Sequence, residues 1–373
     1  MERQLMRVAA LIASSLFLIG CASAEKSADA SGAMGERLAA ETAAAIDSAV
    51  DAAVRDGFGG QVAIMRNGKI VYSRAAGFAD NALKTPVRAD TLYHTASMTK
   101  FFTAILTLKA VEEGLLSLDS DASALFAGTP LADRRFALRD LLDHRSGLRS
   151  TYAAEAEIDA DEALQAIAAA NAANVGNGEF RYSNDGYDLL AILLERTYGK
   201  TYEALFRERI AAPAGISAFS FWGEADLENP RLLGQPLTPL SDAMKKRNYG
   251  MIGSAGLLIS AEDLVRFLDA LDRGLIIGPD MLAELNKPRA QISIGHALYG
   301  AFLIETSLGP ARSVRGAEDW GDNGYLNDYI ECGFAVAVLT SRGPAEGSGK
   351  PFFRDSLILE IENSLTPDCG PSL

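Results

Sequence analysis

The strand patterns of this chain stand at its two ends, with helical patterns between them. Near the N-terminus two strand-like stretches, 62–65 and 70–72, flank Asn67-Gly68, a dipeptide typical of tight hairpin turns. Further strand patterns come late in the chain, at 298–305, 325–331 and 334–340. A strand needs neighbours to pair with, so strands from both ends are expected to meet in one antiparallel sheet.

Helical patterns account for most of the remaining chain. The segment between the two groups of strands, about residues 100–272, is mainly helical and forms an insert. Stretches at 36–55 and 353–363 predict one helix near each end of the domain. The fold class predicted is therefore mixed α/β (α+β), an antiparallel sheet flanked by helices. A single domain spanning residues 35–373 is expected.

The N-terminus has the features of an export signal. Arg3 and Arg7 precede an almost wholly apolar run, 8–20, which is too short to span a bilayer but suits a signal-peptide core. Residues 1–20 are therefore predicted to be a signal peptide. Residues 21–34 are small and polar, and they are predicted to be a tether.

Two interpretations of the end of this signal remain open. Residues 18–21 (Leu-Ile-Gly-Cys) resemble the lipobox of bacterial lipoproteins, in which the cysteine, here Cys21, is lipidated. Residues 22–24 (Ala-Ser-Ala) also fit simple secretion. Both interpretations predict an exported protein, either on the periplasmic face of a bacterial membrane, tethered through Cys21, or free in the periplasm or outside the cell.

Two cysteines remain if Cys21 carries lipid. Cys332 precedes an apolar strand, and the helix near the C-terminus should run back beside that strand and bring Cys369 close. In an oxidising compartment this arrangement favours a Cys332–Cys369 disulfide, with two free thiols as the alternative.

The charge balance and the histidines restrict the partners. The net charge is −14, whereas a nucleic-acid partner requires a basic surface, so none is expected. His94, His144 and His296 lie at no metal-ligand spacing, and they are expected to be structural or surface residues. Neither a metal nor a cofactor is predicted, and no feature indicates the oligomeric state.

A candidate nucleophile stands at the start of a helical pattern that ends before Gly114. Ser97 and Lys100 lie three residues apart, so they share one face of the helix and the amine can approach the hydroxyl. The positive end of the helix dipole favours a developing alkoxide on Ser97. About one S-x-x-K is expected by chance in a chain of this length. The catalytic interpretation of Ser97 and Lys100 therefore depends on the surrounding sequence.

Four segments, in order, supply those surroundings. They are LYHTASMTKFFTAILTLKAVEEGLLSL (92–118), FALRDLLDHRSGL (136–148), FRYSNDGYDLLAILLERTYG (180–199) and GSAGLLISAEDLVRFLDALDRG (253–274). Together they resemble the serine β-lactamase and penicillin-binding protein superfamily, and most closely its class C β-lactamase, D-Ala-D-Ala carboxypeptidase and esterase branch. The resemblance covers about residues 59–340 and implies a β-lactamase/transpeptidase-like fold.

The family's second motif, Tyr-x-Asn, is matched by Tyr182-Ser183-Asn184. The resemblance implies that Tyr182 takes the proton of Ser97 and later delivers it to the leaving group, together with Lys100. It implies that Asn184 orients the substrate and the lysine, because an amide both donates and accepts hydrogen bonds.

The family's third motif departs from its usual form. Relatives carry Lys-Thr-Gly or His-x-Gly, whereas this chain offers Trp320-Gly321-Asp322 in one register and Asp319-Trp320-Gly321 in another. Substrate binding is predicted for Trp320, Gly321, Asp322 and Asn323, and an oxyanion N–H is expected from Asp322 or Asn323, with that of Ser97 as the second. Neither register provides the cation that would bind a substrate carboxylate, unless Arg312 or Arg315 reaches in.

Two loop features have an open role. Gly253–Gly256 matches a loop that borders the active site in relatives, although a tight turn without contact fits equally well. Trp222 and Tyr249 are loop aromatics that could line a pocket.

The favoured function is an exported serine hydrolase that forms an acyl-enzyme on Ser97 and cleaves esters, amides or peptide bonds of a small-molecule or peptide substrate. Because of the altered third motif, esterase or D-Ala peptidase activity is favoured over efficient β-lactamase activity. The alternative is a catalytically weak penicillin-binding or sensor lipoprotein that keeps the fold.

Overall fold

The computed structural model describes residues 37–122, 126–174, 178–225, 229, 233–236, 245–343 and 353–369. They belong to one structural unit, Glu36–Leu373, and all structural statements concern this unit. The predicted signal peptide, the tether and Cys21 lie outside the described residues. Within the described ranges, no helix is both long and apolar enough to cross a membrane.

An eight-stranded sheet forms the centre of the unit, in the order β2-β1-β11-β10-β9-β8-β7-β6. Neighbouring strands are antiparallel throughout. The strands are β1 (Gly60–Arg66), β2 (Lys69–Ala76), β6 (Ala290–Ile292), β7 (Gly295–Ala297), β8 (Phe302–Thr306), β9 (Gly309–Ala317), β10 (Asn323–Tyr329) and β11 (Phe334–Thr340). The first strand pairs with the last, which confirms the expected sheet built from both ends of the chain.

Local sequence explains the first hairpin. Asn67 and Gly68 both have positive φ, 49° and 77°, the left-handed conformation that a tight two-residue hairpin turn requires. The hairpin places β1 between the edge strand β2 and β11, where Gly60 lies opposite Thr340 of β11 and Arg66 lies opposite Phe334. β1 is consequently buried along most of its length.

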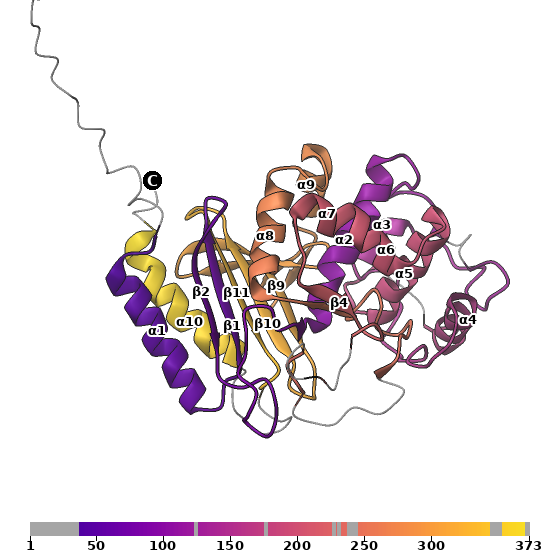
Figure 1. The fold of residues 1–373 in the computed structure, drawn as a ribbon. Coiled ribbons are helices and arrows are strands. Elements are labelled where there is room, and N and C mark those ends of the chain that lie inside the picture. The colour runs from indigo at the N-terminus through magenta and orange to yellow at the C-terminus, as the bar shows by residue number, and fades with distance from the viewer. Residues whose placement is uncertain are drawn as a thin grey trace, which may run out of the picture. The chain divides into compact units, whose positions relative to one another are not determined.

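Helices cover both faces of the sheet. On one face, α1 (Ala40–Arg55) and α10 (Phe353–Leu365) lie side by side (Figure 1). Their apolar side chains form one core with every second side chain of the strands, because alternate residues of a strand point to the same face of the sheet. On the other face, α8 (Ala261–Asp272) packs on β1 and β11. A sheet covered in this way has no solvent-facing side over its central strands.

The insert surrounds α2 (Thr99–Glu112), whose side chains at Phe101, Phe102 and Ile105 are fully buried. Its other helices include α3 (Leu138–Leu142), α4 (Ala160–Ala170), α5 (Asn184–Tyr198), α6 (Tyr202–Phe206) and α7 (Ala212–Ala214). After the insert, α9 (Pro279–Leu285) packs on α2. A small sheet, in the order β3-β5-β4, joins the insert to the segment before α2. Its strands are β3 (Tyr93–His94), β4 (Phe219–Phe221) and β5 (Leu257–Ile259).

Two details differ from the sequence patterns. The strand expected at 298–305 begins at Phe302, because the Leu298 N–H bonds the Ala301 carbonyl in a turn where Gly300 has a φ of 67°. The edge strand β6 and its neighbour β7 have three residues each, which is too short to show an alternation of apolar and polar residues.

A disulfide joins Cys332, in the turn between β10 and β11, to Cys369, with their Cα atoms 5.0 Å apart. α10 returns beside the sheet and ends in the short helical turn Thr366–Asp368, which brings Cys369 to that turn as expected from the sequence. The Arg66 guanidinium also donates a 2.9 Å hydrogen bond to the Asp368 carbonyl. These links fasten the end of the chain to the sheet.

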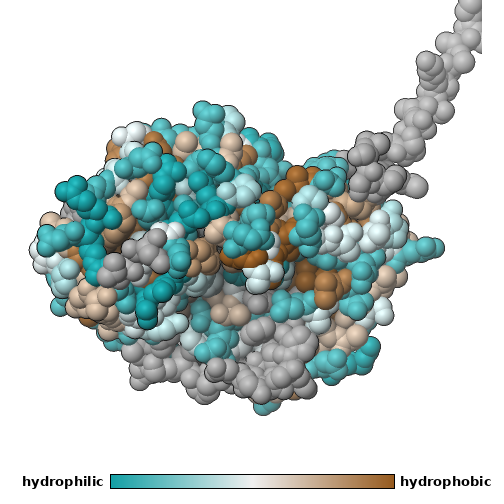
Figure 2. Space-filling view, turned by 180° about the vertical axis from the view of Figure 1, so that it is seen from behind, coloured by the Kyte–Doolittle hydropathy of each residue, from teal (hydrophilic) through white to brown (hydrophobic). Residues whose placement is uncertain are grey.

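Figure 2 shows one face of the molecule, on which hydrophilic side chains predominate and apolar ones gather in a few places. Such a surface accords with the net charge of −14.

Candidate active site

Ser97 lies in a single 3-10 turn, Ala96–Met98, that leads directly into α2. Ala96 has a φ of +50°, so the backbone turns sharply just before the nucleophile. Lys100 follows one turn later and is almost completely buried. Its Nζ lies 3.1 Å from Ser97 Oγ and donates a 2.9 Å hydrogen bond to the Ser254 carbonyl. The predicted approach of amine and hydroxyl is therefore present.

Tyr182 reaches the same hydroxyl from the segment before α5. Its OH donates a 2.7 Å hydrogen bond to Ser97 Oγ, and Lys100 Nζ lies 4.9 Å from the centre of its ring. The Tyr182 side chain is 41% exposed, so the site opens to solvent on this side. Three groups separated by up to 85 residues thus meet at one oxygen atom.

His144 supports Tyr182 from behind. The His144 ring packs against the Tyr182 ring with centroids 4.6 Å apart, and its Nδ1 accepts a 3.1 Å hydrogen bond from the Ser183 N–H. Burial, with a further contribution from the Lys100 charge, lowers the pKa of His144 to about 3, so the ring is neutral at physiological pH. The expectation of a structural histidine stands, but its contact with Tyr182 was not foreseen, because the two residues are 38 positions apart in the sequence.

Asn184 is the first residue of α5, and its N–H donates a 2.8 Å hydrogen bond to Ser150 Oγ. Its Oδ1 is buried and has no hydrogen-bond partner among the described residues. A buried amide oxygen without a partner is costly, so it is suited to receive a donor from a substrate. Substrate orientation by Asn184 remains a prediction.

The Gly253–Gly256 loop contacts the site directly. Its Ser254 carbonyl receives Lys100 Nζ, and the Gly253 N–H donates a 3.2 Å hydrogen bond to Asp188 Oδ1. Burial raises the pKa of Asp188 well above its usual value, while the nearby Lys100 charge opposes this shift. The loop thus holds the lysine amine in place and connects it to a buried carboxyl group on α5.

The strand beside the nucleophile is β9, and it corrects both predicted registers of the third motif. A Cβ on Gly316 would overlap the Thr95 carbonyl and lie 3.0 Å from the Ser97 N, so the strand backbone packs directly against the turn that carries Ser97. Residues 318–322 instead form the turn from β9 to β10, closed by a 2.8 Å hydrogen bond from the Glu318 N–H to the Asp322 carbonyl. Neither 319–321 nor 320–322 is the strand segment next to Ser97.

The side chains predicted to bind substrate are engaged within this turn. Trp320 Nε1 donates a 2.8 Å hydrogen bond to Asp322 Oδ2, which lies 3.3 Å from His94 Nδ1. Asn323 Nδ2 donates a 2.8 Å hydrogen bond to the Gly321 carbonyl. Asp322 and Asn323 are buried, so these contacts shape the turn rather than present polar groups at Ser97.

The structure also changes which backbone N–H group is the second candidate donor of the oxyanion hole. Because residues 318 and 322 form a hydrogen-bonded pair, the next such pair is 316 and 324, and the Ala317 N–H points away from β10. On its other side, β9 pairs with β8 only from Gly309 to Ser313. The Ala317 N–H, rather than that of Asp322 or Asn323, is therefore the strand amide beside Ser97.

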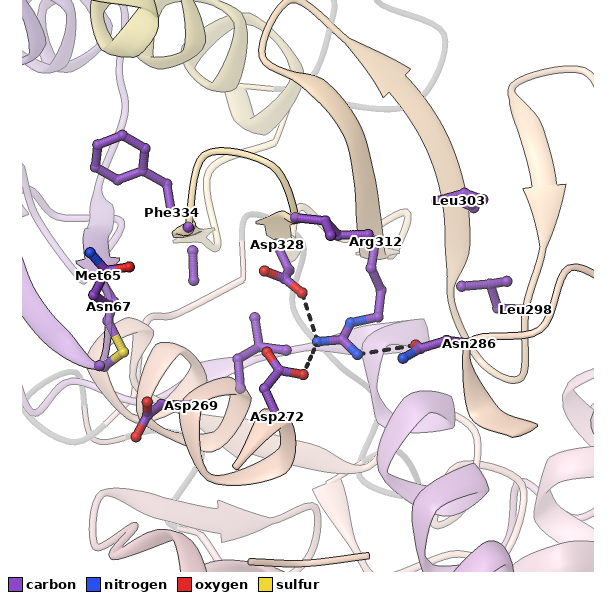
Figure 3. Close-up of a pocket in the computed structure, with 15 residues that line it drawn as sticks. Met65, Asn67, Asp269, Asp272, Asn286, Leu298, Leu303, Arg312, Asp328 and Phe334 are labelled. Carbon is purple, nitrogen blue, oxygen red and sulfur yellow. Dashed lines mark hydrogen bonds and ion pairs between the residues drawn. The ribbon is translucent and has the colours of Figure 1, made fainter. Parts of the chain in front are cut away.

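The two arginines that could supply a cation contact other residues. Arg312 lies in another cavity, where its Nη2 is 2.7 Å from Asp272 Oδ1 and 2.8 Å from Asp328 Oδ2 (Figure 3). Arg315 lines the cavity next to Ser97, but its guanidinium lies over the Tyr325 ring, 4.6 Å from the centroid. The cation common in relatives is not replaced by either residue.

The cavity next to Ser97 is narrow, about 20 Å³, which is room for one water molecule. The cavity in Figure 3 is larger, about 420 Å³, but Ser97 does not line it. Leu298 lines both cavities and therefore separates them. Chemistry rather than cavity size identifies the site, because Ser97, Lys100 and Tyr182 meet only at the narrow cavity.

The loop aromatics do not line this cavity. Trp222 is buried against the His94 ring, with centroids 4.5 Å apart, and Tyr249 donates a 2.6 Å hydrogen bond to Glu195 Oε2. Within the part of the chain that the structure describes, no three His, Cys, Asp or Glu side chains are grouped as metal ligands would be.

The sheet, the insert and the Ser97–Lys100–Tyr182 cluster define the class of serine hydrolases related to β-lactamases and penicillin-binding proteins. The Beta-lactamase family model matches residues 46–349, and the chain belongs to this family.

D-aminopeptidases are among its relatives. The D-aminopeptidase of Brucella ovis is 28% identical over 267 residues, which are 69% of this chain and 51% of that protein. The D-aminopeptidase of Brucella anthropi is 31% identical over 243 residues, 60% of this chain and 46% of that protein. The chain therefore spans about half the length of these relatives.

Solved structures share the fold at lower identity. The D-amino acid amidase from Ochrobactrum anthropi SV3 complexed with D-phenylalanine is 22% identical, with a TM-score of 0.74, over 87% of this chain and 99% of that one. The penicillin-binding protein from Bacillus halodurans is 19% identical, with a TM-score of 0.71, over 85% and 98%.

Proposed function

We propose that this protein is an exported amidase or peptidase that forms an acyl-enzyme on Ser97 and acts on D-amino acid amides or on peptides with an N-terminal D-residue. The observation that carries the proposal is the convergence of Lys100 Nζ and Tyr182 OH on Ser97 Oγ. The named activities of the D-aminopeptidase and D-amino acid amidase relatives support this choice of substrate.

In the acylation step, Ser97 Oγ attacks the carbonyl carbon and its proton passes to Tyr182 or Lys100, both within hydrogen-bond distance. The developing oxyanion is stabilised by the N–H groups of Ser97 and Ala317. The proton then moves to the leaving amine as the C–N bond breaks. Water attacks the resulting ester, gives its proton to the same groups and regenerates the Ser97 hydroxyl.

The altered third motif bears on the substrate. A cation on the strand beside Ser97 would bind the carboxylate of a penicillin or of a D-Ala-D-Ala peptide. The guanidinium groups of Arg312 and Arg315 are engaged elsewhere, so a substrate without a carboxylate at this position suits the site better. Amidase action on a D-amino acid amide fulfils that condition.

The test compares wild type, Ser97→Ala and Ser73→Ala, the last a matched change of an exposed serine on β2. Labelling by a fluorophosphonate probe and release of ammonia from D-alaninamide and L-alaninamide are measured. Serine-97-dependent labelling with faster release from the D-amide is expected, and Ser73→Ala should behave like wild type. Absence of Ser97-dependent labelling, or cleavage of the L-amide alone, would overturn the proposal.

A further inference from the structure

We propose that the Glu318 carboxylate binds the free α-ammonium of the substrate and so selects substrates with an unblocked amino terminus. This inference rests on the proposed amidase or peptidase function and assigns a specificity residue within the same site. Glu318 stands where the chain turns from β9 into β10, two residues after Gly316, whose backbone packs against the Ser97 turn.

The register of the hairpin determines which way Glu318 faces. Residues opposite each other in an antiparallel pair share a face, and so do alternate residues along one strand. Gly316 faces the Ser97 N, and a Cβ on its partner Gly324 would lie 2.7 Å from Met98 Sδ. Asp322, which pairs with Glu318, faces His94. Glu318 therefore lies on the same face of the hairpin as Gly316, the residue that packs against the Ser97 turn.

The electrostatic surroundings agree with this placement. Burial raises the pKa of Glu318 to about 7, the charges of His94 and Lys100 lower it, and Asp322 and Asp319 add to the rise. The carboxylate thus lies within electrostatic range of the lysine that contacts Ser97. On the open side, burial and then the charge of Glu318 raise the pKa of Tyr152, and Tyr182 contributes to the same shift.

The Glu318 carboxylate is not paired with a cation among the described residues. Among the described residues, no side chain or backbone group forms a hydrogen bond or salt bridge with its oxygens. Lys100 is already engaged by Ser97 and Ser254. Glu318 is half-buried, and an ammonium ion would provide both the opposite charge and hydrogen-bond donors for its carboxylate.

The polarity of this part of the site is therefore opposite to that of relatives with a third-motif cation. A substrate carboxylate would meet the negative charge of Glu318, whereas an α-ammonium would be attracted. N-acylation removes the positive charge of the substrate, so it should remove the advantage.

The experiment measures KM and kcat for D-alanine p-nitroanilide, N-acetyl-D-alanine p-nitroanilide and p-nitrophenyl acetate. The variants are Glu318→Gln and, as a matched control, Asp319→Asn at the exposed neighbouring carboxylate. Glu318→Gln is expected to raise KM for the free-amine anilide by about 10- to 100-fold, the range for loss of a charged hydrogen bond. Its KM for p-nitrophenyl acetate, which has no ammonium group, should change far less than its KM for the free-amine anilide, and Asp319→Asn should leave both close to wild type.

Equal use of the free and N-acetylated anilides by wild type, or an unchanged ratio in Glu318→Gln, would overturn the inference while leaving the proposed function intact. A second readout separates the two claims. If neither anilide is cleaved but D-phenylalaninamide inhibits ester hydrolysis, and Glu318→Gln abolishes that inhibition, then the ammonium site stands and the amidase proposal fails.

Discussion

The reacting groups depend on neighbours that do not themselves react. His144 holds the Tyr182 ring by stacking and fixes the following backbone by accepting the Ser183 N–H. It does so in the left-handed conformation, with a φ of 57°. Because burial keeps the ring neutral, the site contains a histidine that does not titrate where histidines usually do.

This histidine should make stability depend on pH. Its pKa is about 3 in the folded state, whereas a histidine in the unfolded chain has its ordinary pKa of 6.5, so between these values only the unfolded chain binds the proton. Stability is present above pH 6.5 and is lost as the pH falls, at up to about 1.4 kcal/mol per pH unit from this group alone.

The measurement is urea unfolding from pH 7 to pH 4 for wild type and His144→Asn. Asparagine tolerates the left-handed conformation and retains a side-chain acceptor for the Ser183 N–H. The variant should lose less stability per pH unit than wild type, whatever its stability at pH 7. Parallel pH profiles for the two proteins would contradict the assigned pKa.

At the scale of elements, the site is formed where α2 and its preceding turn meet β9. The contact requires a residue without a side chain at Gly316, because any Cβ there meets the backbone of Thr95 and Ser97. The helix carries Ser97 and Lys100, and the strand contributes the Ala317 amide. Displacing one element against the other would separate groups that must act on one substrate atom.

Gly316→Ala is therefore expected to reduce kcat/KM by about 100-fold, the effect of a misplacement of 1 Å at a reacting centre. Overpacking should also lower the free energy of unfolding by about 1 to 3 kcal/mol. Gly186→Ala in α5 is the control, because its Cβ would meet no atom closer than 3.7 Å. Equal activity of Gly316→Ala and wild type would contradict the close packing of β9 against the turn Ala96–Met98 that carries Ser97.

The disulfide acts on the other side of the sheet. It closes a loop of 37 residues between the β10–β11 turn and the end of α10. Replacing both cysteines, Cys332→Ser with Cys369→Ser, should lower the free energy of unfolding by about 2 to 4 kcal/mol. Labelling of Ser97 at 25 °C should remain, and reducing agent should affect only wild type. A double variant as stable as wild type would contradict this role.

At the scale of the whole molecule, elements from the two ends of the described unit lie side by side. β1 pairs with β11, and α1 lies beside α10, so the domain is complete only when the last helix is present (Figure 1). The insert, which begins just after Ser97, joins the sheet through β3, β5 and the turn that carries Ser97.

The predicted lipid attachment at Cys21 can be tested on the full chain. Cys21→Ser is expected to move the protein from the membrane fraction to the soluble fraction of the cells that make it, because the lipid chains supply the attachment. Ser23→Ala is the matched neighbouring control and should stay with the membrane. Continued partition of Cys21→Ser with membranes would favour a different mode of export.

The sequence by itself determined the reacting groups and the origin of the sheet. Ser97 and Lys100 are related by helical spacing, and Tyr182 and Asn184 by a short motif, so both relations are local. The hairpin at Asn67-Gly68 and the late strand patterns likewise indicated a sheet built from both ends.

Only the tertiary structure decided the opposite wall of the site. Which residues of β9 stand beside Ser97 depends on the register between β9, β10 and the turn before α2, and such pairing is not encoded in any short stretch. The Trp320-Gly321-Asp322 motif therefore drew attention to a turn, whereas Gly316 of β9 packs against the turn that carries Ser97. A glycine that is required by close approach of another backbone looks like any other glycine until that backbone is in place.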